Sequence, residues 1–71
     1  GLHKIEVYPN PSSGLIQVKA PFPVRQIEVY DLFGKRVLQD YSMEIHLDQK
    51  GLFILHVSDG RRWYSEKVLI Q

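Results

Sequence analysis

The chain has 71 residues with nine basic and eight acidic side chains, a net charge of +1 and no cysteine. This length supports one small domain over residues 1–71, which buries only about 60% of the surface of its unfolded form and has no disulfides or zinc–thiolate sites to supplement its core. Interspersed charges and short apolar runs argue against a basic nucleic-acid patch, a polybasic membrane segment and a membrane-spanning segment.

Alternation of apolar and polar residues with a period of two is the main pattern along the chain, and it is typical of strands with one buried face. It predicts strands over residues 4–8, 15–19, 26–30, 35–39, 44–47, 52–57 and 62–70. In the sixth of these, Leu52 and Ile54 lie opposite the inward row and favour a strand covered on both faces. Seven short strands with turn signals between them, and no helical period, predict an all-β sandwich.

The first break between strands is YPNPSSG, residues 8–14. Tyr8 and Asn10 each precede a proline, whose ring disfavours helical backbone at the preceding residue. The Asn10 side chain can bond nearby backbone N–H groups, and Gly14 can take a positive φ where the next strand begins. We expect a rigid turn, which either sets only the entry of the chain into the sandwich or also presents Pro9–Pro11 to a receptor.

Later breaks contain glycine at turn positions. In YDLFGKRV, Asp31 suits the first position of a turn and Gly34 its end. Gly51 follows LDQK, and Asp59–Gly60 predicts a two-residue hairpin turn in which both residues take a positive φ. Because each glycine has a sufficient local reason to be present, we interpret all three first as turn residues.

Side chains capable of chemistry are scattered along the chain. The candidates are the histidines His3, His46 and His56, Asp48 two residues after His46, and the serines Ser12 and Ser13. No pair has the close spacing of a metal site, neither serine lies in a nucleophile-elbow pattern, and no carboxylate pair suits acid–base catalysis. We therefore expect no catalytic, cofactor or metal site, and no enzyme activity.

Residues 61–64, RRWY, form the densest basic and aromatic cluster. Exposed aromatic rings stack on sugars or bases, while arginines bind phosphates or carboxylates. In a regular strand Arg62 and Tyr64 face one side and the other two face the opposite side, so the four side chains cannot form one platform. The alternative, which we favour, is that Trp63 or Tyr64 folds over an open edge of the core.

Three segments together resemble one known family. They are VYPNPSSG near the start, IEVYDLFGKRV in the middle and IHLDQKGLFILHVSDGRRWYSEKVLIQ at the end. In this order and spacing, over nearly the whole chain, they are similar to the type A C-terminal sorting domain of the type IX (Por) secretion system of Bacteroidetes. The resemblance implies an immunoglobulin-like antiparallel β-sandwich, which agrees with the strand pattern.

The resemblance also implies a function. Such a domain is a non-catalytic signal at the end of a secreted protein that enters the periplasm through an ordinary signal peptide. The outer-membrane translocon recognises the folded domain, and in many members a sortase-like peptidase removes it and joins the cargo to an anionic lipopolysaccharide. The cargo would precede Gly1, with cleavage at or before that residue, and would end at the cell surface or in the medium. No cofactor, nucleic-acid partner or membrane insertion is implied.

The motifs of the family can be carried over position by position. They fall on Tyr8, Pro9, Asn10 and Pro11, then on Ile27, Val29, Tyr30, Asp31, Gly34, Lys35 and Val37, and last on Gly51, Phe53, Leu55, Val57, Gly60, Lys67, Val68 and Ile70. Phe53 stands where the family usually has tyrosine, and Gln71 where members often end in a basic residue. The candidates for recognition by the machinery are Pro9, Asn10, Pro11, Asp31, Gly34, Lys35, Gly51, Gly60, Lys67, Val68, Leu69, Ile70 and Gln71.

The terminal segment has a second interpretation beyond the core. Val68 and Ile70 are expected to point inward, while the residues alternating with them point outward. A partner that adds a strand edge-on would bond this backbone and read those outward side chains. The same kind of edge would also allow weak self-association.

Two other functions fit a small sandwich. One is an extracellular binding or adhesion module, carbohydrate-binding or fibronectin-like, appended to a secreted enzyme. The other is a structural cap or dimerisation unit with an exposed edge strand. Position in the precursor separates the first from a sorting domain, because a sorting domain is C-terminal and absent from most mature cargo.

Overall fold

The computed structural model describes residues 5–71, and these form seven strands and no helix. The strands are β1 (Glu6–Tyr8), β2 (Leu15–Lys19), β3 (Gln26–Tyr30), β4 (Arg36–Asp40), β5 (Glu44–His46), β6 (Gly51–Ser58) and β7 (Trp63–Ile70). Each lies within or close to a range predicted by the alternation. Within residues 5–71 no helix is long and apolar enough to cross a membrane. Gly1, His3 and Lys4, on which some expectations rest, lie outside the described residues.

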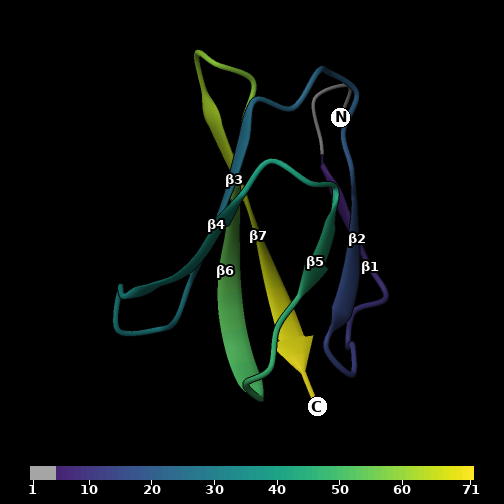
Figure 1. The fold of residues 1–71 in the computed structure, drawn as a ribbon, viewed down its shortest axis with the longest axis vertical. Coiled ribbons are helices and arrows are strands. Elements are labelled where there is room, and N and C mark those ends of the chain that lie inside the picture. Colours follow the sequence, from purple (N-terminus) through teal and green to yellow (C-terminus); the bar gives the residue numbers. More distant parts are fainter. Residues whose placement is uncertain (1–4) are drawn as a thin grey trace.

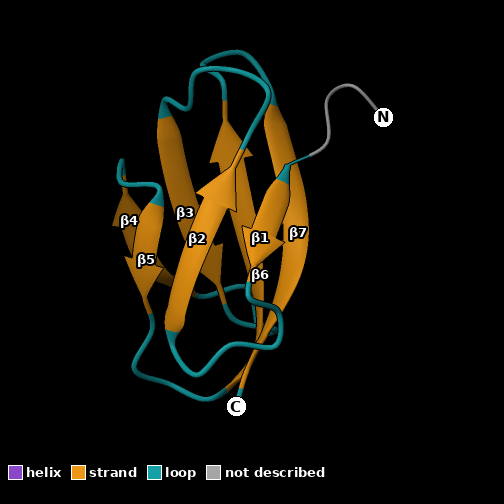
Figure 2. Cartoon of the chain, turned by 90° about the vertical axis from the view of Figure 1, so that its right-hand side faces the viewer, coloured by secondary structure: helices purple, strands orange, loops and turns teal. Residues whose placement is uncertain are grey.

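The strands form two antiparallel sheets that face each other (Figure 1; Figure 2). One sheet has the order β1-β2-β5 and the other the order β4-β3-β6-β7. A seven-strand immunoglobulin domain of the constant type places its fourth strand in the sheet of the first strand. Here β4 pairs instead with β3, from Ile27 opposite Asp40 to Tyr30 opposite Arg36. The predicted two-sheet antiparallel sandwich is confirmed, with its fourth strand in the opposite sheet.

The hydrophobic core lies between the two sheets. Its most deeply buried side chains, each less than 2% exposed, are Ile16, Ile27, Val29, Ile45, Leu55, Val57 and Val68. Each such side chain contributes about 1.5–3 kcal/mol by leaving water. Because no cysteine is present, this core and the strand hydrogen bonds hold the domain together.

The outer face of β6 is more open than the sequence suggests. Leu52 is 36% exposed, and Ile54 is half-buried. Strand β6 lies between β3 and β7 in its sheet, and only its other face is turned toward the second sheet. The prediction of a strand covered on both faces is therefore wrong, because neighbouring side chains on the same sheet give this face only partial cover.

The connection between β6 and β7 is a four-residue loop, Asp59–Arg62, rather than a two-residue hairpin turn. Gly60 has a φ of 98°, but no residue other than glycine has a positive φ within residues 5–71. Asp59 Oδ1 accepts the backbone N–H groups of Arg61 and Arg62, both at 2.8 Å. This side-chain turn holds Asp59 at negative φ, so the prediction of positive φ at both residues is wrong for Asp59.

Candidate recognition surface

Two candidate segments far apart in the sequence meet along the outer edge of β7. Asn10 Nδ2 donates to the Lys67 carbonyl at 2.8 Å, and Asn10 Oδ1 accepts the Leu69 N–H at 3.0 Å. The Ser12 N–H donates to the Leu69 carbonyl, and the Gln71 N–H donates to the Ser12 carbonyl, both at 2.8 Å. A side-chain amide and one residue of backbone thus bond β7 as a neighbouring strand would. We call this contact between residues 10–12 and 67–71 the edge seal.

Ser12 holds the edge seal in place from inside the fold. Its side chain is buried, with 4% exposure, and its Oγ accepts the Gly14 N–H at 3.0 Å and donates to the Leu15 carbonyl. Gly14, at φ 136°, also accepts the Leu47 N–H at its carbonyl. The bonds of Pro9 and Pro11 to their preceding residues are both cis. The turn predicted from YPNPSSG is therefore a tertiary element as well as a local one.

The edge seal corrects the expectation that a partner adds a strand to residues 67–71. The outward carbonyl and N–H of Leu69, the Lys67 carbonyl and the Gln71 N–H already have partners within the domain. Val68 and Ile70 are buried in the core. A partner that leaves the fold intact therefore reaches this segment through exposed side chains, chiefly those of Lys67 and Gln71.

A second group of candidates forms the turn between β3 and β4, which we call the β3–β4 tip, residues 31–35. Asp31 Oδ1 accepts the N–H groups of Phe33 and Lys35, both at 2.9 Å. The Asp31 backbone also exchanges hydrogen bonds with Lys35 and Gly34. Asp31 and Gly34, predicted to shape this turn, do so.

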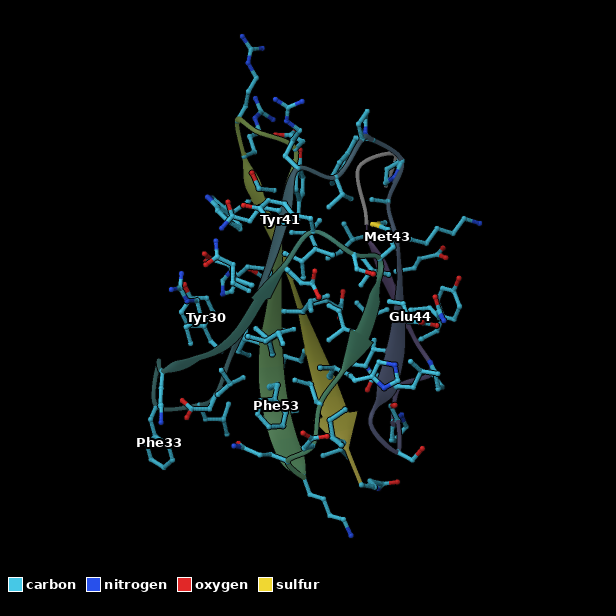
Figure 3. The ribbon with its side chains drawn as sticks, in the orientation of Figure 1. Tyr30, Phe33, Tyr41, Met43, Glu44 and Phe53 are labelled. Atoms are coloured by element: carbon cyan, nitrogen blue, oxygen red, sulfur yellow. The ribbon has the colours of Figure 1, made fainter. Side chains whose placement is uncertain are left out.

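The tip exposes two apolar side chains that are not among the sequence candidates. Leu32 is 62% exposed and Phe33 is 96% exposed. Figure 3 shows Phe33 pointing away from the sandwich, whereas Phe53 on β6 is buried. The available signal was the pair of adjacent apolar residues inside a turn, where the alternation of the strands is interrupted.

The remaining candidates lie at opposite ends of the sandwich. Gly51 begins β6 opposite Ile70, beside the edge seal. Gly60 lies in the β6–β7 loop, at the upper end in Figure 1, far from the C-terminal end of β7. The thirteen sequence candidates therefore divide among the edge seal with the adjoining Pro9 and Gly51, the β3–β4 tip and the β6–β7 loop.

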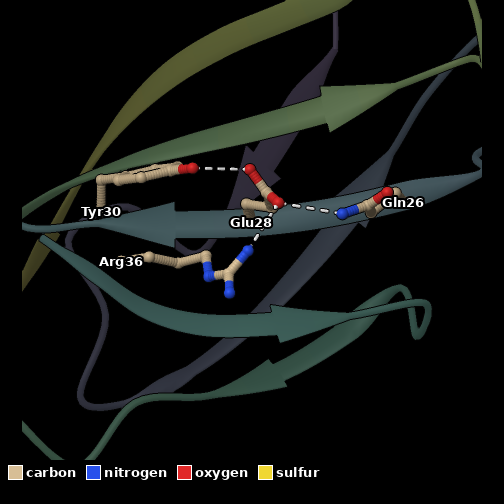
Figure 4. Close-up of polar contacts among 4 residues, drawn as sticks. All are labelled: Gln26, Glu28, Tyr30 and Arg36. Atoms are coloured by element: carbon tan, nitrogen blue, oxygen red, sulfur yellow. Dashed lines mark hydrogen bonds and ion pairs between the residues drawn. The ribbon is translucent and has the colours of Figure 1, made fainter. Parts of the chain in front are cut away.

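A polar network lies on the outer face of the larger sheet at the base of the tip (Figure 4). Glu28 accepts hydrogen bonds from the Tyr30 hydroxyl at 2.7 Å, from Gln26 Nε2 at 2.9 Å and from Arg36 Nη1 at 3.2 Å. These bonds, that of Tyr30 first, lower the pKa of Glu28 below its ordinary value. The same hydrogen bond raises the pKa of Tyr30.

Aromatic rings continue this outer face toward β7. The His56 ring lies edge-on to Tyr30, with ring centres 5.1 Å apart, and to Trp63 at 6.4 Å. With Glu28 these side chains line an open hollow of about 410 Å³. Trp63 is half-exposed there, whereas Tyr64 packs on Phe22 at the border of the core. The expectation that an aromatic ring folds over the core edge is met by Tyr64 and not by Trp63.

The histidines and carboxylates that the structure describes do not converge. Over residues 5–71 no group of three or more His, Asp or Glu side chains is arranged to hold a metal ion. His46 lies on β5, while His56 lies on the outer face of the other sheet, with Nδ1 at 3.1 Å from Ser65 Oγ.

A comparison with protein families gives one match. The family model of the secretion system C-terminal sorting domain covers residues 6–71. The chain belongs to this family, the type IX sorting domains. The comparison with curated proteins finds no match to the chain. A type IX sorting domain interacts with the type IX secretion machinery and serves export to the cell surface or the medium.

The sorting domain carries all thirteen candidate residues within the matched range, and the edge seal and the β3–β4 tip lie there as well. The comparison assigns no role to a single residue. The role of each candidate in recognition therefore stays a prediction. Exposure and hydrogen bonding determine which of the candidates a partner can reach.

Proposed function

We propose that this sorting domain is a non-catalytic C-terminal signal for a cargo joined upstream of Gly1. In this proposal the cargo crosses the periplasm, the outer-membrane translocon of the type IX system recognises the folded domain, and a sortase-like peptidase removes the domain when the cargo is attached at the surface. The match of the family over residues 6–71 carries the proposal.

The fold supports recognition of a folded surface rather than of a linear peptide. Residues 9–11 and 67–71 are far apart in the sequence, yet they form one continuous piece of surface through the edge seal. An unfolded chain would not present them together. Weak self-association through an edge strand stays a prediction, and with the C-terminal half of β7 sealed, the other edge of the larger sheet is β4.

A transport assay tests the proposal. Residues 1–71 are fused to the C-terminus of a fluorescent protein that carries a signal peptide, in one host with an intact type IX system and in one without it. Export to the surface or medium only in the intact host is the expected result. Retention in the periplasm of both hosts would overturn the proposal and favour a binding module.

The structure also determines which variants are informative in this assay. Truncation before Lys67 removes Val68 and Ile70 from the core and unfolds the domain, so it cannot separate recognition from folding. The double substitution Lys67→Ala with Gln71→Ala removes only exposed side chains beside the edge seal. We expect this variant to remain folded and to be exported less efficiently.

A further inference from the structure

Phe33 is the most exposed large hydrophobic side chain of residues 5–71. It is 96% exposed, ahead of Tyr41 at 70% and its neighbour Leu32 at 62%. The core gains nothing from it, because its ring extends from the end of the β3–β4 hairpin into solvent (Figure 3). An aromatic side chain held in water is a typical anchor for a partner, since hot spots of protein interfaces are rich in large aromatic residues.

The turn holds this anchor in a fixed position. Asp31 Oδ1 binds the N–H of Phe33 itself and that of Lys35, both at 2.9 Å. The Asp31 N–H donates to the Lys35 carbonyl at 2.9 Å, and Gly34 takes a φ of 84° that closes the turn. A preorganised anchor loses less conformational entropy on binding than a flexible loop would.

The tip is also accessible when a cargo is attached. In Figure 1 and Figure 2 the hairpin of β3 and β4 lies on the side of the sandwich away from β1. The first strand of the domain and Phe33 therefore lie on different sides of the sandwich. With the cargo upstream of Gly1, as proposed above, Phe33 stays free to reach a partner.

Charge at the tip indicates the chemistry of that partner. Asp31 is engaged by two backbone N–H groups, and Arg36 forms an ion pair with Glu28 at 3.2 Å. Lys35 is exposed and has no ion-pair partner within the described range. The tip thus offers two apolar side chains beside an exposed ammonium group that is free to pair with a partner, whereas the carboxylate of Asp31 is directed at backbone N–H groups.

We propose that Leu32 and Phe33 dock into an apolar pocket with an acidic rim on a protein of the type IX machinery. The proposal rests on the proposed sorting function. A lipid surface fits less well, because stable binding to anionic membranes needs several basic residues around a larger apolar area. Here a single lysine accompanies two apolar side chains.

The transport assay described above tests this docking with Phe33→Ser. We expect export of the reporter to fall about tenfold or more, because a hot-spot anchor is lost. Phe33→Leu keeps an apolar anchor and should restore most of the export. Tyr41→Ser is the matched control, since it removes an exposed aromatic ring from another loop. Lys35→Glu should reduce export several-fold, and Lys35→Arg should not.

The outcomes separate the two proposals. If the wild-type reporter is not exported by the intact host, the sorting function fails and the docking proposal fails with it. If wild-type and Phe33→Ser reporters are exported equally, only the docking proposal is overturned. Thermal unfolding of the purified variants, expected to match the wild type, shows that lost export does not reflect lost folding.

A vesicle experiment distinguishes a protein pocket from a lipid surface. The purified domain is sedimented with vesicles of anionic phospholipid, with the Phe33→Ser variant in parallel. We expect neither protein to sediment with the vesicles. Sedimentation of the wild type but not of the variant would overturn docking into a protein pocket in favour of a lipid surface.

Discussion

The edge seal and the β3–β4 tip each depend on one Asx side chain, Asn10 and Asp31, yet the partners of these side chains lie at very different distances along the chain. Asn10 bonds the backbone of residues 57 and 59 positions away. Asp31 bonds N–H groups two and four residues away. The Asn10 turn therefore joins the beginning of the domain to its last strand, whereas the Asp31 turn bonds only its own backbone.

This difference separates stability from exposure. The edge seal satisfies backbone groups that an open strand would leave available to other chains, which is a common way to protect an edge. The tip satisfies its own backbone and so leaves its apolar side chains free. Substitutions that remove hydrogen bonds of the edge seal should therefore change folding, and substitutions of the exposed side chains at the tip should change binding.

The largest difference in stability is expected between alanine substitutions at Gly14, which is bonded to Ser12 of the edge seal, and at Gly34 in the β3–β4 tip. A Cβ at Gly14 would lie 2.9 Å from the Leu47 carbonyl oxygen, at a φ of 136°, whereas a Cβ at Gly34 meets no atom within 4 Å at a φ of 84°. We expect Gly14→Ala to lower the free energy of unfolding by about 2–4 kcal/mol. Gly34→Ala should cost about 1–2 kcal/mol from backbone strain alone. Urea denaturation measures both, and equal losses would contradict the comparison.

A smaller loss is expected when the edge seal loses its side-chain amide. Asn10→Ala removes two hydrogen bonds to β7 and should cost about 1–2 kcal/mol. Hydrogen exchange of the Leu69 amide should accelerate, because its acceptor is gone. Ser13→Ala, a change of an exposed neighbour, is the control and should leave both quantities unchanged. Unaltered protection of Leu69 in the Asn10 variant would argue against the seal.

Acid should weaken the fold through groups outside the edge seal, whose bonds involve no titratable side chain. The pKa of Glu28 lies below its ordinary 4.5, chiefly through the Tyr30 hydroxyl, and the pKa of Asp59 lies below 3.8 through the N–H groups of Arg62 and Arg61. Groups with a lowered pKa stabilise the fold above their ordinary values, and this contribution is lost as the pH falls through the folded values.

The Glu28 contribution can be isolated by substitution. Glu28→Gln should flatten the dependence of the unfolding temperature on pH below the ordinary Glu28 pKa of 4.5. At the alkaline end the pKa of Tyr30 is raised above 10.0, so its contribution is present below that value and is lost as the pH rises through the folded value. Tyr30→Phe should remove this alkaline loss. An unchanged acid slope in Glu28→Gln would mean that the carboxylate contributes nothing.

The smallest effect on stability is expected at the tip. Phe33→Ser should change the free energy of unfolding by less than about 0.5 kcal/mol, because the ring is almost fully exposed. The variant should also be more soluble than the wild type. A loss of more than about 1 kcal/mol in urea denaturation would show that the tip contributes to folding and would remove the contrast with the edge seal.

The strands were predictable because their signal is local. Alternation such as that of Ile27 and Val29 with polar neighbours reports which face is buried, whatever the strand pairs with. It does not report the pairing itself, so the place of β4 beside β3 could not be read from the sequence. The Asp59–Gly60 error had another cause, since the side chain of Asp59 bonds the loop backbone and stabilises a longer connection than the dipeptide suggests.

The candidate surface was predictable only in part. Asn10 stood out through its flanking prolines, but its partners are determined by the packing of the whole sandwich, which no local pattern encodes. Phe33 was missed for a different reason. Its hydrogen-bonded turn was predictable from Asp31 and Gly34, but Leu32 and Phe33 between them were not among the candidates. Adjacent apolar residues inside a turn are the signal to examine, because a turn has no inward face to bury them.

The place of β7 in the order of synthesis has one more consequence. It is the last of the seven strands to leave the ribosome, yet Val68 and Ile70 fill the core and Gln71 closes the edge seal. The sandwich cannot close while those residues are still inside the exit tunnel. A nascent chain, or one terminated before Gln71, therefore has no folded sorting domain. A protein in which this domain is folded has been translated completely up to the last strand.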